Sequence, residues 1–213
     1  MKNTFTLLLL LTIFNLPLHS QTIYQKGDSI VISRFGKTFF KKYITLECLY
    51  CQCNWAGKDL RIENCNDSDR SCSNYRFLYN IIIPEKEIKF NLQFSLDKNR
   101  DSLYGTYSLP PVKLSRKQLI FLSKNEINKI AYNRRFAAGI QPWRFNFVWI
   151  EKPIDEWYLQ HQTDKIKKWG KGKFIWSVEN LITDTHEGTT GENMCLDAVT
   201  GEYLYGLLSI GTP

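Results

Sequence analysis

Short sequence patterns occur twice in this chain of 213 residues, in the same order. Residues 30–33 resemble 120–123, residues 76–79 resemble 173–176, residues 95–97 resemble 195–197, and Leu-Tyr-Gly closes both series at 103–105 and 204–206. The separations are 90, 97, 100 and 101 residues, a slow drift that unequal loops would produce. We therefore expect a duplicated α+β unit, which limits the chain to two small, similar folds.

Helix signals come early in each copy. Ser123 and Glu126 form a capping-box pattern, and apolar residues then recur at three- and four-residue spacing. This pattern predicts a helix to about Arg135, with Ser115–Gln118 as an alternative earlier start. The corresponding helix of the first copy is predicted over 35–43.

Strand signals follow both helices. Apolar and aromatic residues alternate with polar ones along 144–149, 174–178 and 90–96, which predicts strands with one buried face. Pro110-Pro111 marks the expected joint between the copies, because proline interrupts both α-helices and the hydrogen bonding between β-strands.

The closing turn of the second copy is the most informative local pattern. Residues 196–204 read as strand, tight turn and strand, in which Asp197 accepts hydrogen bonds from turn amides and Gly201 supplies a positive φ. In the first copy, we expect Asn99 or Asp101 to adopt the left-handed conformation.

A Trp-centred strand, a strand ending in Asp-Ala-x-Thr-Gly-Glu-x-Leu, and a preceding Ser-capped helix resemble a PepSY domain over about 113–208. The first half, about 24–109, shares the resemblance only through the repeat. The resemblance implies two tandem PepSY-like units, each a helix packed on a small antiparallel sheet. It also implies an inhibitory or folding-assistance role, as in propeptides of thermolysin-type metallopeptidases, and it carries no catalytic residues. The insert with Pro153 and the cysteine cluster depart from the family pattern.

The amino terminus has the pattern of a secretory signal peptide. Lys2 precedes a short apolar run, 5–14, and Ser20 precedes polar Gln21. We therefore expect residues 1–20 to be a leader, 21–110 a cysteine-rich α+β unit and 111–213 a PepSY-like unit. The mature chain is then periplasmic or secreted, without a transmembrane segment. Its formal charge falls from +7 to +6 without Lys2, which favours acidic partners but is too small to indicate nucleic-acid binding.

All six cysteines lie in the predicted mature chain, and in an oxidising compartment they are disulfide candidates. They are Cys48, Cys51, Cys53, Cys65, Cys72 and Cys195. A zinc site of Cys48, Cys51, Cys65 and Cys72, or redox chemistry at Cys48 and Cys51, are the alternatives. The spacing does not determine the pairing.

Five of the six tryptophans fall between 143 and 176. Trp149 and Trp176 lie in alternating segments and are expected in the core. Trp157 and Trp169 lie near Lys167, Lys168 and Lys171, without apolar periodicity. Aromatic side chains beside cations suit recognition of peptides, glycans or acidic proteins, whereas packing of a long loop onto the sheet is the alternative.

The function that fits these patterns is a non-enzymatic binding or inhibitory module for a peptidase or another cell-envelope partner. It needs no cofactor or metal, its partner is a protein or peptide, and its oligomeric state is not predicted. The alternatives are a thiol–disulfide enzyme using Cys48 and Cys51, a hydrolase using His186, and a structural envelope protein stabilised by disulfides.

Overall fold

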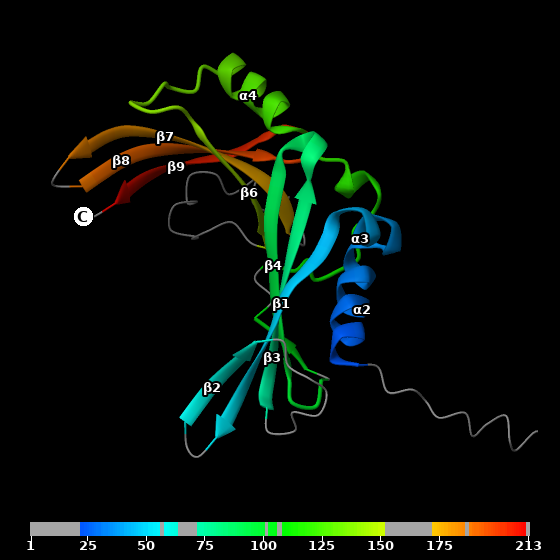
Figure 1. Ribbon diagram of the computed structural model, residues 1–213. Coiled ribbons are helices and arrows are strands. Elements are labelled where there is room, and N and C mark those ends of the chain that lie inside the picture. Colours follow the sequence, from blue (N-terminus) through cyan, green and yellow to red (C-terminus); the bar gives the residue numbers. More distant parts are fainter. Residues whose placement is uncertain are drawn as a thin grey trace, which may run out of the picture.

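The computed structural model describes residues 22–55, 58–63, 72–100, 102–105, 108–151, 172–185 and 188–211, and the predicted leader lies outside these ranges. Helices and antiparallel sheets are both present, which confirms the α+β class. In Figure 1, sheet A stands in the centre with α2 and α3 along one side, and sheet B extends from its upper end with α4 above it. No helix of the described residues is long and apolar enough to cross a bilayer.

Two helices open the first half, α2 (Ile23–Phe35) and α3 (Lys37–Tyr43). Thr22 begins α2, because its hydroxyl accepts from the Gln25 amide at 3.2 Å while the Gln25 side chain accepts from the Thr22 amide at 3.0 Å. One stripe of the helix is buried, at Ile23, Gly27, Val31 and Phe35.

The helix predicted over 35–43 is present as α3, whereas α2 before it was not predicted. The capping box at Thr22 starts a helix that includes residues 30–33, whereas their supposed counterparts, 120–123, precede α4. This match within the repeat is not a structural equivalence.

Sheet A is antiparallel throughout, in the order β2-β1-β3-β4-β5. Its strands are β1 (Ile44–Trp55), β2 (Lys58–Glu63), β3 (Cys72–Ile83), β4 (Ile88–Asp97) and β5 (Leu103–Tyr104), with the 3-10 turn η1 (Pro84–Lys86) between β3 and β4. Helix α2 lies on the inner face of sheet A, where a Cβ on Gly27 would come within 2.3 Å of the Phe77 ring. The Tyr79 hydroxyl donates to Asp28 at 2.8 Å and joins the same two elements.

The second half begins with the 3-10 turn η2 (Lys117–Leu119) and helix α4 (Lys124–Asn133). The predicted Ser123–Glu126 capping box is present. The Ser115–Gln118 pattern also forms hydrogen bonds, but it starts only the short turn η2 and not the helix.

Sheet B is an antiparallel sheet in the order β6-β7-β8-β9. Its strands are β6 (Arg144–Ile150), β7 (Lys173–Thr185), β8 (Gly188–Asp197) and β9 (Tyr203–Gly211). The Trp176 indole donates to the Leu122 carbonyl at 3.1 Å, and the Leu122 amide donates to the Ala198 carbonyl at 2.8 Å. The segment before α4 is thereby attached to both β7 and the turn after β8.

Both halves place helix before strands, and if β2 is left aside the four strands of each half follow one another across the sheet. The registers show which residues correspond. Leu96 pairs with Tyr75, whereas Leu196 pairs with Trp176. These registers align Tyr75 with Trp176, whereas the sequence match aligns Tyr79 with Trp176. The sequence match is therefore displaced along β3. Alternation could not reveal this displacement, since Tyr75 and Tyr79 face the same side.

Eight aromatic side chains join the halves, and we call them the seam cluster: Phe35, Phe39 and Phe90 from the first half, and Phe121, Phe147, Trp149, Phe174 and Trp176 from the second. The Phe174 ring lies 5.6 Å from Phe90 and 6.2 Å from Phe35, centroid to centroid. Buried residues of both halves belong to one hydrophobic cluster. The predicted boundary near residue 110 thus separates two sheets that share a core.

Candidate functional site

A cavity of about 450 Å³ opens beside the seam cluster, between the linker and the Asp197 turn. We call it the seam cavity. Its walls are Val112, Leu114, Lys117, Gln118, Trp149, Gly172, Lys173, Phe174, Asp197, Val199 and Thr200. Its volume is within the range of ligand sites in proteins, and apolar walls with a few polar groups are typical of such sites.

The Asp197 turn forms one wall. The Asp197 carboxylate accepts from the amides of Val199 at 2.9 Å and Thr200 at 3.0 Å, and Gly201 has a φ of 71°. This is the geometry that the sequence predicts for the second copy. In the first copy Arg100 adopts the positive φ, 66°, so the prediction of Asn99 is wrong and Asp101 lies outside the described residues.

The charge of Asp197 is balanced within the protein, since its second carboxylate oxygen lies 2.9 Å from Lys173 Nζ. Burial raises the pKa of Asp197, but the hydrogen bonds from Lys173 and from the Thr200 and Val199 amides outweigh burial and hold the pKa below its usual value. The carboxylate is therefore ionised at neutral pH, and the wall is rigid and nearly neutral.

The apolar wall contains Trp149 and Phe174, whose rings meet edge to face at 4.9 Å. Gly172 lies against Trp149: its φ is 99°, and a Cβ there would come within 2.5 Å of the indole ring. Trp149 is buried, and its Nε1 has no hydrogen-bond acceptor within the described part of the chain. Such a buried donor is uncommon in native proteins.

Cations surround the opening. Lys117 lines the cavity, and Lys113 and Arg116 flank it in the linker; all three are exposed. None of them forms an ion pair with a carboxylate of the described residues. Because Lys173 and Asp197 balance each other, these three residues make the linker side of the rim positively charged.

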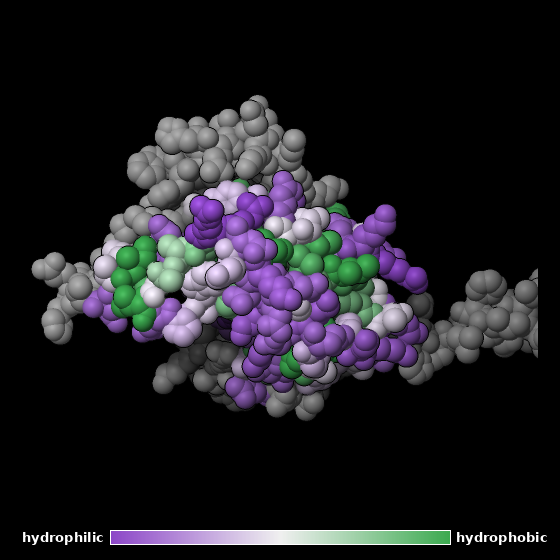
Figure 2. Space-filling model, turned by 90° about the horizontal axis from the view of Figure 1, so that it is seen from above, coloured by the Kyte–Doolittle hydropathy of each residue, from purple (hydrophilic) through white to green (hydrophobic). Residues whose placement is uncertain are grey.

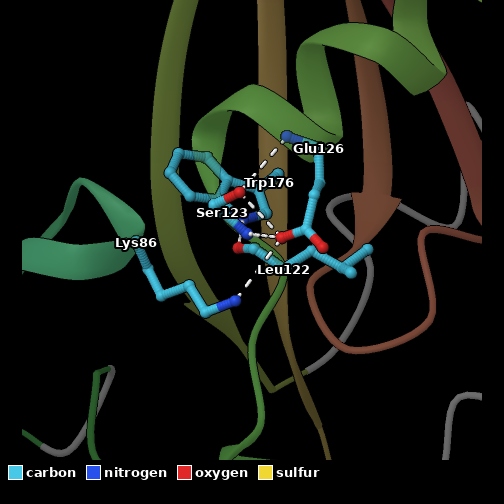
Figure 3. Close-up of polar contacts among 5 residues, drawn as sticks. All are labelled: Lys86, Leu122, Ser123, Glu126 and Trp176. Atoms are coloured by element: carbon cyan, nitrogen blue, oxygen red, sulfur yellow. Dashed lines mark hydrogen bonds and ion pairs between the residues drawn. The ribbon is translucent and has the colours of Figure 1, made fainter.

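Two ion pairs join α4 to the first half. Figure 3 shows the Glu126 carboxylate returning to Ser123 while Lys86 reaches toward it from η1. The Ser123 amide and hydroxyl hold the pKa of Glu126 at about 2, with a smaller contribution from Lys86. A second ion pair, Lys124 with Glu87 at 3.8 Å, also spans the two halves.

A second, wider hollow of about 620 Å³ lies between α4 and the segment before β6, beside exposed Ile140. In the view from above, apolar surface forms separate areas with hydrophilic surface between them (Figure 2). This hollow lacks the buried aromatic walls of the seam cavity, and we regard it as the weaker candidate.

The residues predicted to bind a partner, Trp157, Trp169, Lys167, Lys168 and Lys171, lie outside the described residues. His186 lies outside them as well. Among the described residues, no group of three histidine, cysteine or acidic side chains is placed to hold a metal ion.

The cysteines fall into different classes. Cys51 and Cys72 are disulfide-bonded, whereas Cys48 and Cys195 carry free thiols. The predictions that Cys48 and Cys195 form disulfides are wrong. Cys195 is buried in sheet B beside Asn193, and burial raises the pKa of its thiol to about 11.

Cys48 does not bond to Cys51, because three residues along a strand separate side chains onto opposite faces. The strand therefore does not bring together the sulfur atoms of Cys48 and Cys51, which the thiol–disulfide enzyme alternative requires. The side chains of Cys53 and Cys65 lie outside the described residues.

Sequence reasoning missed the linker wall of the cavity. Val112, Leu114 and Lys117 follow the two prolines that we interpreted only as a joint. The available signal was Val-Lys-Leu, an alternation of apolar and cationic residues directly after Pro111. Comparison with known proteins finds no matching family model and no significantly similar curated sequence or solved structure.

Proposed function

We propose that this protein is an exported, non-enzymatic binding module that holds an apolar group of a protein partner in the seam cavity. The observation that carries the proposal is the cavity itself, whose walls come from the linker, the end of β6, the start of β7 and the Asp197 turn. Backbone hydrogen bonds and buried rings fix these walls before any ligand arrives, which lowers the entropic cost of binding.

The PepSY resemblance supports the same class of function. Of the elements that carry it, the Asp197 turn and the start of the Trp176 strand line the cavity, and the Trp176 indole bonds to Leu122, just before the helix. We propose a peptidase or another cell-envelope protein as the partner, and export through the amino-terminal leader as the route by which the two meet.

A peptide-display selection on the immobilised protein tests this function. Val112→Trp places a large ring at the rim of the cavity, and Ile82→Trp is the matched control, because Ile82 is also exposed but lies on the outer face of sheet A. We expect enriched peptides whose affinity falls at least about tenfold with Val112→Trp and stays within about twofold with Ile82→Trp. No enrichment, or equal losses for both variants, would contradict the proposal.

A further inference from the structure

The charges and walls of the seam cavity indicate what kind of peptide it accepts. We infer that its ligand is an acidic peptide segment with one large apolar side chain, which enters the cavity while flanking carboxylates meet Lys113, Arg116 and Lys117. This inference rests on the proposed function and narrows its ligand class.

Apolar and charged groups are separated in the seam cavity. Leu114, Trp149 and Phe174 are buried walls, whereas the three linker cations are exposed at the rim. A ligand that satisfies both parts must carry apolar and anionic groups close together, with the apolar group innermost.

The charges that face a ligand at the linker side of the rim are positive. Asp197 is the only acidic residue of the cavity wall among the described residues, and Lys173 and two backbone amides already occupy its oxygens. Lys117 has no such partner within the described chain, and Lys113 and Arg116 add to its field. A carboxylate that reaches the rim therefore meets net attraction, and a cation meets repulsion.

An unsatisfied donor in the cavity wall favours a peptide over an aliphatic chain. The Trp149 side chain lines the cavity, and its buried indole N–H has no acceptor among the described residues. A peptide backbone carries a carbonyl acceptor beside every side chain, whereas an aliphatic chain carries none. A peptide thus supplies the apolar group, the anions and the acceptor together.

Fluorescence anisotropy tests the inference with the strongest peptide from the display selection and versions in which every acidic residue is amidated or replaced by lysine. We expect the amidated version to bind about tenfold more weakly and the lysine version not to bind measurably. Raising the salt concentration from about 0.05 to about 0.5 M should weaken the acidic peptide several-fold.

Lys117→Glu should weaken the acidic peptide about tenfold, and Lys117→Arg should preserve its binding. Lys89→Glu is the matched control, since Lys89 is exposed on β4, on the outer face of sheet A. Equal affinity for the acidic and amidated peptides would overturn the inference but leave the proposed function standing, whereas the absence of any selected peptide would end both. Tighter binding to phosphatidylglycerol vesicles than to the peptide, with the same loss in Lys117→Glu, would also overturn it.

Discussion

The central strands of the two sheets are buried to different extents. Along β3 of sheet A, inner residues such as Phe77 and Tyr79 are buried, while Arg76 before them and Ile82 after them are exposed. Along β7 of sheet B, five consecutive residues, 174–178, are all buried. Sheet A is therefore covered on one face and β7 on both, although the two halves share an order of elements. The two halves thus share an order of elements but differ in how deeply their central strands are buried.

The largest effect is expected where the two halves meet. Phe174→Ala removes a ring that contacts Phe35 and Phe90 of the first half, and it should lower the free energy of unfolding by about 3–5 kcal/mol. Urea denaturation followed by circular dichroism measures this loss. A loss below about 1 kcal/mol would show that the halves do not share a core.

Two isoleucines that lie outside the core shared by the halves, one in β7 and one in β3, test the difference in burial directly. Ile175→Ala in β7 should cost about 2–5 kcal/mol because Ile175 is 1% exposed, whereas Ile82→Ala in β3, 43% exposed, should stay within about 0.5 kcal/mol. Thermal and urea unfolding of both variants provides the comparison. Equal costs would remove the distinction between the sheets.

The turns should differ by a smaller amount. Gly201→Ala forces a side chain into a positive φ and toward Ile130, so we expect a loss of at least about 1–2 kcal/mol. Arg100→Gly relieves the corresponding strain in the first half but adds glycine entropy and removes the Arg100–Tyr75 contact, so its effect should be near zero. A stability gain from Gly201→Ala would contradict the observed turn.

The helix caps should produce the smallest difference, one that depends on pH. Ser123→Ala and Thr22→Ala should each cost about 0.5–2 kcal/mol at neutral pH, because each removes an N-cap. Only the Ser123 box contains an ionisable partner, Glu126, whose pKa is lowered to about 2 from 4.5. Its stabilisation is therefore complete above about pH 4.5 and is lost as the pH falls toward 2.

The measurement is the cost of each cap substitution at several pH values between 7 and 2. The cost of Ser123→Ala should shrink at low pH, while that of Thr22→Ala should not, since Gln25 does not titrate. A cost of Ser123→Ala that stays constant with pH would show that the Ser123 hydroxyl does not stabilise the Glu126 carboxylate.

The parts of the fold that could be predicted are those with local signals. The Ser123 capping box, the alternation along β4, β6 and β7, and the Asp197 turn all depend on residues close together in sequence. Helix α2 was missed because its apolar run resembles the extended segment before α4. The free thiols of Cys48 and Cys195 were missed because pairing depends on which strands bring cysteines together. The seam cavity needs contacts between residues that are far apart in the chain, for which no local pattern exists.

Backbone amide NMR spectra of the isotope-labelled protein, titrated with the selected acidic peptide, test the central claim that the seam cavity is the binding site. We expect the largest shifts on the linker at 112–118, the start of β7 and the turn at 197–200, which line the cavity. Shifts confined to the outer face of sheet A, with these amides unchanged, would contradict this claim.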